Sequence, residues 1–300
     1  MIGIAVAVPR VSVLMTVHNA ASYLRTAVDS IQDQSFADWE LVVVDDGSTD
    51  ESPRILAEYD DPRVRVIYLP RNIGRTPALR HAFGLARGEY FAVLDADDVA
   101  HWERLFKQVA YLDAHPNTVL LGTWARFVDD RGDTLRHWRP PTDARALHHS
   151  LGWANPIAHS TSMYRARIAA EVGGYPADLP YAQDCGLWLR LAQRGDLAIL
   201  DEELCDQRIV ATSMTRGSRF RADFARDGVT LMCDARRRLV LDELARRRNR
   251  DEIMIAEVKY GLALARSGRM LGGYATVLMA ILRNPLGLLH SRAHRTQFYG

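Results

Sequence analysis

The chain has 300 residues, of which 48% are hydrophobic and 25% are charged, and its formal net charge is +1. These values are ordinary for a globular protein and exclude a chain that is disordered over most of its length. The charge is unevenly divided, because residues 1–216 carry 22 Lys and Arg against 29 Asp and Glu, whereas residues 217–300 carry 16 against 8.

The chain opens with an apolar segment, residues 1–8, that is short and has no basic beginning. We therefore do not predict a secretory signal peptide. No later stretch reaches the roughly 18 apolar residues of a membrane span, so we expect no transmembrane helix. Cys185, Cys205 and Cys233 are widely spaced, which argues against a zinc site or a disulfide framework and favours a reducing cytoplasm.

Four short apolar runs rich in β-branched residues predict strands that are covered on both faces. They are residues 11–17, 41–44, 64–69 and 91–94. Between them, residues 20–34, 52–59 and 76–86 have apolar side chains at helical spacing. Alternating strands and helices predict βαβ units and a mostly parallel sheet. Ligands bind beyond the carboxyl ends of the strands in such sheets, so we expect functional residues directly after these runs.

Polar residues follow all four runs. They are His18-Asn19 after the first, Asp45-Asp46-Gly47-Ser48-Thr49-Asp50 after the second, Asn72-Ile73-Gly74-Arg75 after the third and Asp95-Ala96-Asp97-Asp98 after the fourth. The sequence therefore predicts one site at the carboxyl edge of the sheet.

The rest of the chain mixes element types and then becomes helical. Residues 119–128, 160–164 and 204–210 are predicted strands, and residues 184–194 a predicted helix. After Arg216 we expect arginine-rich amphipathic helices at 219–248 and 252–267, and an apolar helix at 271–282 that stops before Asn284 and Pro285.

The segment Asp95-Ala96-Asp97-Asp98 is the most informative polar group. Carboxylates two residues apart at a strand end can turn towards one pocket, and hard oxygen ligands suit Mg²⁺ or Mn²⁺. The alternative is a solvated acidic loop, or an N-cap for a helix that begins near His101. The residues alone leave both interpretations open.

The other polar groups also have structural alternatives. Within residues 45–50 one Asp could bind a base or sugar, or the segment could be a simple strand-to-helix connection. His18 could stack on a nucleobase or form a structural hydrogen bond. Asp184 begins an apolar helical segment, where it could cap the helix or act as a general base towards an acceptor hydroxyl.

In their order along the chain, these segments resemble the family 2 glycosyltransferases of the GT-A fold. The likeness covers about residues 11–213. It rests on the opening strand 11–19, the helix 27–35, the DDGSTD signature at 45–50, the NIG loop at 72–74, the GEY and DADD segments within 88–98, residues 155–163, the GGY segment at 173–175 and the QD pair at 183–184 before LWLR at 187–190. The resemblance implies an α/β, Rossmann-like, mostly parallel central sheet flanked by helices, here with a C-terminal helical extension.

The resemblance also implies an activity and roles for residues. We expect an inverting transfer of one sugar from a nucleoside-diphosphate sugar to a saccharide or lipid-linked acceptor, in polysaccharide or glycolipid biosynthesis. Asp184 would be the general base and Asp97 the ligand of Mn²⁺ or Mg²⁺. The expected nucleotide-sugar-binding residues are Thr16, His18, Asn19, Asp46, Arg75 and Asp95, and those on the acceptor side are His159, Trp153 and Trp188.

Some residues depart from the family pattern. Gln183 replaces the usual Glu, which leaves Asp184 as the carboxylate of that pair, and Gln207-Arg208 stands where many members have Tyr-Arg followed by His. The Gln/Arg-x-x-Arg-Trp motif of processive synthases is missing, which favours the addition of a single sugar.

The resemblance suggests a division of the chain into a catalytic domain, residues 1–216, and a basic helical extension, residues 217–300. Within the first, residues 1–112 would bind the nucleotide sugar and residues 113–216 the acceptor. In the extension, one predicted helical face carries Leu271, Tyr274, Ala275, Leu278 and Leu282. It could lie in the plane of a membrane, or dock on the core. We expect a cytoplasmic protein, at the inner face of the cytoplasmic membrane if the first alternative holds.

Three other functions are alternatives to this one. A sugar nucleotidyltransferase needs a glycine-rich basic loop after the first strand, which residues 18–22 do not provide. An inactive carbohydrate-binding or scaffold protein is favoured by Gln183 and opposed by the retained Asp95, Asp97 and Asp184. The arginines of the tail alternate with apolar and acidic residues, so we predict no nucleic-acid partner. The sequence makes no prediction of the oligomeric state.

Overall fold

The computed structural model describes residues 8–209 and 221–287. In this part of the chain the strands are β1 Val11–Val17, β2 Trp39–Asp45, β3 Val64–Tyr68, β4 Tyr90–Val93, β5 Val99–Ala100, β6 Thr118–Val128, β7 Thr134–Trp138, β8 Met163–Arg165 and β9 Asp196–Arg208. The helices are α1 Ala21–Gln32, α2 Ser52–Leu56, α3 Arg75–Leu85, α4 Arg104–Ala114, α5 Ala144–Ser150, α6 Ala166–Glu171, α7 Gln183–Leu191, α8 Arg221–Arg238, α9 Glu243–Arg266 and α10 Met270–Arg283, with a 3-10 turn at His159–Thr161.

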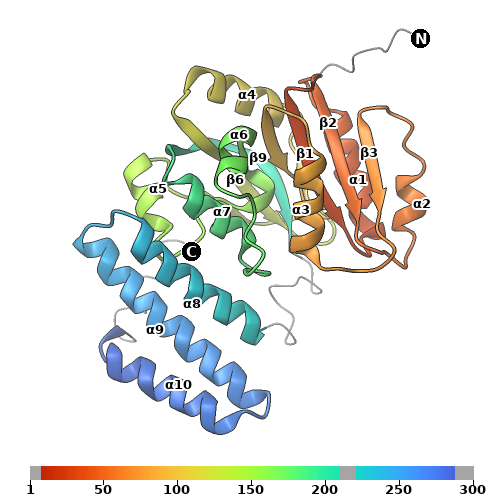
Figure 1. The fold of residues 1–300 in the computed structure, drawn as a ribbon. Coiled ribbons are helices and arrows are strands. Elements are labelled where there is room, and N and C mark those ends of the chain that lie inside the picture. Colours follow the sequence, from red (N-terminus) through yellow and green to blue (C-terminus); the bar gives the residue numbers. More distant parts are fainter. Residues whose placement is uncertain (1–7, 210–220, 288–300) are drawn as a thin grey trace.

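The strands form one nine-stranded sheet with helices on both faces, and α8, α9 and α10 are stacked beside it (Figure 1). The strand order is β3-β2-β1-β4-β8-β6-β9-β5, and β7 pairs with β6 outside this path. The first four strands run parallel, as predicted, and Val13 of β1 lies between Leu41 of β2 and Ala92 of β4. Beyond β4 the sheet is mixed, since β8 is antiparallel to both β4 and β6 while β9 is parallel to β6.

Successive side chains of the central strands enter two different cores. Leu14 of β1 packs in the cluster that contains Leu79 of α3 and Leu187 of α7. Its neighbour Val13 packs in the cluster that contains Leu24 of α1. A strand whose side chains alternate between two apolar layers needs apolar residues at every position, which explains the unbroken runs in the sequence.

Glu40 of β2 is a buried acid that joins three chain segments at the edge of the sheet opposite the carboxyl ends. Its carboxylate accepts hydrogen bonds from Ser12 Oγ at 2.7 Å, Arg65 Nη1 at 2.7 Å and Arg87 Nη2 at 2.8 Å. Burial by itself would raise the pKa of Glu40, but the hydrogen bonds from Arg87, Ser12 and Arg65 lower it below its usual value. The acid is therefore ionised in the folded protein at neutral pH.

We expect Glu40→Ala to lower the free energy of unfolding by about 1–3 kcal/mol, because it removes a buried carboxylate that accepts hydrogen bonds from buried Ser12 and from two partly exposed arginines. Urea denaturation monitored by circular dichroism measures this loss. Glu58→Ala is the control, since the pair of Glu58 with Arg25 is solvent-exposed on both sides and should matter far less. Equal effects of the two substitutions would contradict this account of the sheet edge.

Four predicted elements differ clearly from the observed ones, among them the helix predicted at 252–267, which is the second part of the longer α9. The predicted strand 160–164 is a 3-10 turn followed by the short β8. The predicted strand 204–210 is the end of the longer β9, and residue 210 lies outside the described residues. The predicted helix 219–248 is wrong in the part that is described, because α8 ends at Arg238 and α9 begins at Glu243.

The break between α8 and α9 has a tertiary cause. Leu239 and Leu241 are buried in the same cluster as Leu147 of α5, which draws the chain out of helical geometry. The carboxylate of Asp242 then accepts a hydrogen bond from Ala245 N at 2.9 Å and caps α9. The predicted helix 271–282 is confirmed as α10.

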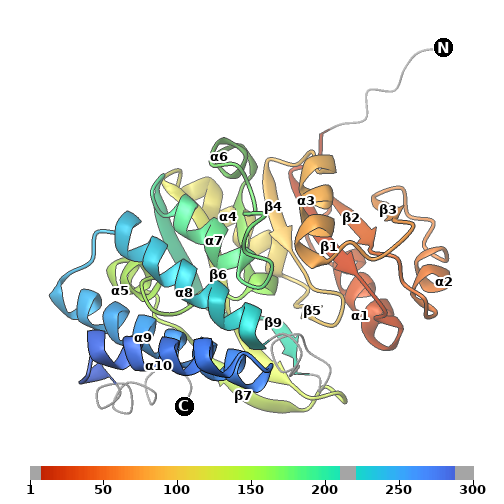
Figure 2. The same ribbon diagram turned by 60° about the horizontal axis from the view of Figure 1, so that its bottom comes forward.

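The helices α8 and α9 are packed against the sheet domain (Figure 2). Leu231 and Ala235 of α8 share a hydrophobic cluster with Leu187 of α7. The buried carboxylate of Asp227 accepts a hydrogen bond from Tyr181 N at 2.9 Å, just before α7. In the ranges 8–209 and 221–287, none of the helices is both long and apolar enough to cross a membrane.

Candidate active site

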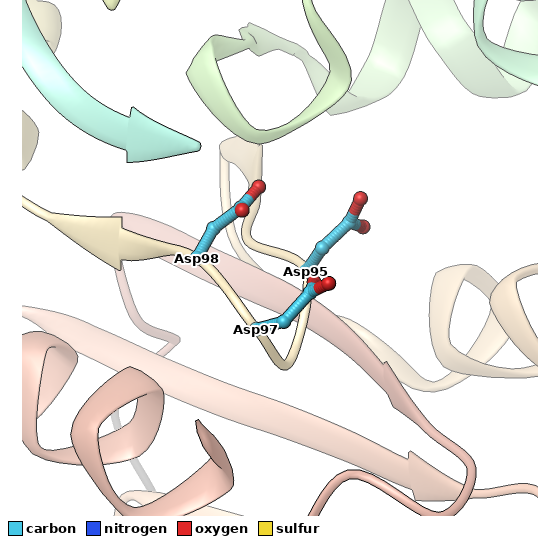
Figure 3. Close-up of side chains that lie close together, drawn as sticks. All are labelled: Asp95, Asp97 and Asp98. Carbon is cyan, nitrogen blue, oxygen red and sulfur yellow. The ribbon is translucent and has the colours of Figure 1, made fainter. Parts of the chain in front are cut away.

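Three acids gather on the loop between β4 and β5, where the sequence predicts functional residues. Figure 3 shows Asp95, Asp97 and Asp98 together on this loop. One carboxylate oxygen of each lies within 4.8 Å of the others. The N–H of Asp98 donates to the carbonyl of Asp95 at 3.1 Å and closes the loop. The chain thus holds three negative groups close together at the carboxyl edge of the sheet.

The carboxylate of Asp95 is bound by the guanidinium of Arg75, which lies in the segment after β3. Both of its carboxylate oxygens lie 2.6 Å from Nη2 of Arg75, the first residue of α3. The same nitrogen lies 3.1 Å from Nδ1 of His159, whose Nε2 lies 3.1 Å from the hydroxyl of Tyr175. Burial would raise the pKa of Asp95, but the charge of Arg75 and the hydrogen bond with His159 hold it well below its usual range. Asp95 therefore stays ionised.

The pKa values of Asp97 and Asp98 are raised, in contrast to that of Asp95. Burial, together with the charge of Asp95, raises the pKa of Asp97 to about 6. Burial and the two neighbouring acids also raise the pKa of Asp98 well above its usual value. The carboxylate of Asp98 accepts a hydrogen bond from the N–H of Arg208 at 2.8 Å. This bond attaches the loop to the end of β9, so Asp98 is not a helix N-cap.

The acidic loop fits a divalent cation. Its ligand atoms are carboxylate oxygens, which Mg²⁺ and Mn²⁺ prefer. Burial and the charge of Asp95 raise the pKa of Asp97, and a bound cation would offset both effects. Asp95 and Asp97 face the cavity described below, so a cation there could also meet an anionic ligand.

Asp46 organises the loop that precedes α3. Its buried carboxylate accepts the N–H of Ile73 at 2.7 Å with one oxygen and the N–H of Gly74 at 2.9 Å with the other. Gly74 has a φ of 96°, a conformation that glycine adopts without strain. Asp46 thereby fixes the start of α3, where Arg75 lies, and Arg75 in turn fixes the position of Asp95. The sequence did not predict this connection between Asp46 and Asp95.

The polar residues at the end of β1 connect two loops. Nδ1 of His18 lies 3.0 Å from the carbonyl of Asp46. Asn19 donates its N–H to Ser48 Oγ at 3.0 Å and accepts the N–H of Thr49 at 2.8 Å. Asn19 and His18 thus hold the end of β1 against residues 46–49, and together with Thr16 they face the same cavity as the acids.

Asp184 is the second residue of α7, and its carboxylate accepts a hydrogen bond from Asn155 Nδ2 at 2.7 Å. Two residues before Asn155, the ring of Trp153 lies under the guanidinium of Arg248 of α9, 5.1 Å from Cζ to the ring centroid. The role of Asn155 was missed, although its segment was recognised, because the contact joins residues that are 29 positions apart.

Of the residues expected on the acceptor side, Trp188 lies outside the cavity, and His159 contacts it only at its inner wall. Trp188 is fully buried in the core and donates its Nε1–H to the carbonyl of Ile157 at 3.0 Å. Its indole therefore cannot contact an acceptor, and its position in the first turns of an apolar helix is a packing position. His159 is 6% exposed and lies behind Asp95, where it supports that carboxylate.

One cavity of about 1860 Å³ connects these groups. Of the predicted residues it is lined by Thr16, His18, Asn19, Asp46, Arg75, Asp95, Asp97, Trp153, His159 and Asp184. Its further wall is formed by α8 and α9, through residues that include Phe224, Leu231, Arg248, Ile255 and Lys259. Sequence patterns did not predict this wall, because an amphipathic helix shows that one face is covered without showing what it faces.

The sequence of the chain matches a known protein family. Residues 12–173 match the family described as glycosyl transferase family 2. The chain is 41% identical over 210 residues to TuaG of Bacillus subtilis, named as a teichuronic acid biosynthesis glycosyltransferase, and the match covers 69% of this chain and 82% of TuaG.

Solved structures share the fold at low sequence identity. TarS residues 1–349 of S. aureus, solved with UDP-GlcNAc, has a TM-score of 0.66 at 18% identity, over 92% of each chain. The mannosyltransferase PcManGT of Pyrobaculum calidifontis, solved with GDP-Man and Mn²⁺, has a TM-score of 0.60 at 20% identity, over 98% of this chain and 82% of that chain. The predicted GT-A fold is confirmed. By its family match and its relatives, this chain is a glycosyltransferase and belongs to glycosyltransferase family 2.

Proposed function

We propose that this enzyme transfers one sugar from a nucleoside-diphosphate sugar to an acceptor hydroxyl, with inversion at the anomeric carbon. The observation that carries the proposal is that Asp97 and Asp184 line one cavity, so that a cation site and a candidate base face the same space. The neighbours solved with UDP-GlcNAc and with GDP-Man and Mn²⁺ support a nucleotide-sugar donor. The name of TuaG supports a role in polysaccharide synthesis.

Asp184 acts as the general base in this proposal. Asn155 fixes one of its oxygens, which directs the carboxylate towards the cavity. As the acceptor oxygen forms its bond to the anomeric carbon, Asp184 takes the hydroxyl proton. The bond from that carbon to the diphosphate oxygen breaks on the opposite face, and the electron pair leaves with the nucleotide. The configuration is therefore inverted in one displacement, and no covalent enzyme intermediate forms.

Asp97 and Asp95 would hold the divalent cation, Mn²⁺ or Mg²⁺. When bound, such a cation supplies positive charge to the diphosphate as the leaving group departs. Arg75 keeps Asp95 ionised and fixes its direction, with His159 behind it. Arg75 and His159 thus hold the acidic loop in one conformation before a cation binds. The positive charge of the cation would then offset the repulsion between the carboxylates.

The nucleotide would lie against the loops held by Asp46, Thr16, His18 and Asn19. All four residues line the cavity. Asp46, His18 and Asn19 are fixed by hydrogen bonds between His18 and Asp46 and to residues 48–49 and 73–74. A rigid, preformed cradle lowers the ordering cost of binding a ligand.

We expect Asp46→Asn to weaken nucleotide binding about tenfold or more, because an amide in place of the carboxylate points an N–H group at the N–H of Ile73 or Gly74. The loss of one hydrogen bond should loosen the start of α3 and shift Arg75. Isothermal titration with UDP and GDP measures the change, and Asp60→Asn, an exposed acid on the same half of the chain, is the matched control. Unchanged affinity in Asp46→Asn would remove Asp46 from the binding site.

The acceptor, a saccharide or lipid-linked sugar, would bind in the part of the cavity that is lined by α8 and α9. Phe224 of the wall formed by these helices has an exposed ring, and Arg248 of the same wall lies over the ring of Trp153, which also lines the cavity. Aromatic faces bordered by polar groups suit sugar rings. A lipid-linked acceptor would place the enzyme at the inner face of the cytoplasmic membrane.

The stereochemistry of donor hydrolysis tests the proposed reaction without knowledge of the acceptor. Water can take the place of the acceptor hydroxyl, and ¹H NMR identifies the sugar anomer that appears first. An α-linked nucleotide sugar should release the β-anomer before mutarotation. First appearance of the α-anomer would contradict the single displacement.

A further inference from the structure

The outermost helix, α10, exposes an apolar face over most of its length. Leu271 is 91% exposed, Leu278 59% and Leu282 65%. Tyr274, Met279 and Leu286 extend the same face and are also exposed. Figure 1 places α10 on the far side of α9 from the sheet. An exposed apolar stripe of this extent on a soluble domain marks an interaction surface.

The opposite face of α10 is already occupied by α9. Gly273 approaches the backbone of α9 so closely that an added Cβ would lie 2.5 Å from the carbonyl oxygen of Gly261. Ala280 is 1% exposed, and Asn284 Nδ2 donates to Asp251 Oδ1 at 2.8 Å. At 100° per residue, positions 273, 280 and 284 lie opposite 271, 278 and 282. The stripe therefore is not the face by which α10 docks on the protein.

Among the described residues, the unpaired charge next to this face is basic. Arg266 and Arg269 are exposed directly before the stripe. Arg283, in the last turn of α10, is ion-paired with Glu257 of α9 at 2.9 Å. Two copies of this surface facing each other would bring like charges together, whereas an anionic bilayer surface complements them.

We propose that α10 is an in-plane membrane helix that places Leu271, Leu278 and Leu282 among the lipids and its flanking arginines at anionic headgroups. The helix has 14 residues, fewer than the roughly 20 that a span requires, so it lies on the bilayer and does not cross it. Of the two alternatives that the sequence left open for this stripe, the exposed face supports the membrane one. The inference is independent of the transfer chemistry.

Co-sedimentation of the full chain with vesicles tests the inference. One vesicle set contains phosphatidylethanolamine with a quarter of phosphatidylglycerol, and the other contains phosphatidylcholine alone. The wild type should bind the anionic vesicles, and a triple variant with Leu271→Gln, Leu278→Gln and Leu282→Gln should bind them at least about tenfold more weakly. The matched control carries Phe106→Gln, Leu135→Gln and Val240→Gln, three exposed apolar residues elsewhere, and should bind like the wild type.

A second variant separates charge from apolar contact and does not alter the stripe. Arg266→Gln with Arg269→Gln should lower binding to the anionic vesicles severalfold and leave binding to phosphatidylcholine unchanged. Circular dichroism and nucleotide binding confirm that each variant is folded. The proposal is overturned if the wild type does not bind anionic vesicles or if the triple variant binds them equally. A lipid-free wild-type dimer that the triple variant abolishes would assign the face to a second copy instead.

Discussion

Replacement of Asp184 by Asn should lower kcat by about 10²–10⁴-fold and leave the donor affinity nearly unchanged, because the amide cannot accept the acceptor proton. Asn is close in size to Asp, so the packing at the start of α7 should be kept. Nucleotide release, followed in a coupled assay, measures kcat, and titration with the nucleoside diphosphate measures donor binding. A loss confined to kcat is the signature of an interaction that acts in the transition state.

Two further variants define what Asp184 does. Asn155→Ala removes the hydrogen bond that directs the carboxylate but leaves the base, so kcat should fall less than in Asp184→Asn. Asp178→Asn alters an exposed acid on the segment before α7 and should behave like the wild type. If Asp184→Asn keeps wild-type kcat, another residue is the base.

Asp97→Asn should abolish the metal-dependent binding of the donor. It should also raise the free energy of unfolding of the metal-free protein. A cation on the diphosphate contributes several kcal/mol in the transition state, so transfer should fall by at least about 10²-fold. Burial and the charge of Asp95 raise the pKa of Asp97 to about 6. An acid whose pKa is raised in the folded state destabilises that state as the pH rises above its unfolded pKa, and the effect is complete above its folded pKa.

The stability of the metal-free protein checks the sign of this effect. At pH 7.5 Asp97→Asn should be more stable than the wild type by on the order of 1–2 kcal/mol. The difference should shrink as the pH falls through about 6 and vanish below about 4, where the acid is protonated in both states. Asp133→Ala, on an exposed turn, is the control. A variant that is less stable than the wild type at pH 7.5 would show that Asp97 has a structural role.

The parts of the fold that follow from local patterns were predictable from the sequence. The unbroken runs of β1 and β2 arise because their alternate side chains enter two cores, and the polar loops follow from where those runs end. The break between α8 and α9 was not predictable, because Leu239 and Leu241 continue a helical apolar pattern and only their burial ends the helix.

In the candidate site, too, local motifs were predictable from the sequence and contacts between distant segments were not. Asp95, Asp97 and Asp184 could be located by motif, since each lies at the start of a loop or helix next to an apolar run. The hydrogen bonds of Asp46 to Ile73 and Gly74, and of Asn155 to Asp184, join segments that are distant in sequence. The apolar neighbours of Trp188 already indicated a packing position, and the acceptor-side role came from the family resemblance alone.

Metal-dependent stabilisation by donor nucleotides tests the central claim most directly. The wild type and Asp97→Asn are melted with UDP-, GDP- and dTDP-sugars, with and without Mn²⁺. A ligand that binds only the folded state raises the melting temperature. We predict that one nucleotide class raises it only when Mn²⁺ is present, and only in the wild type. Saturating nucleotide sugars that stabilise neither protein, or both equally with and without Mn²⁺, would contradict the proposed donor and cation site.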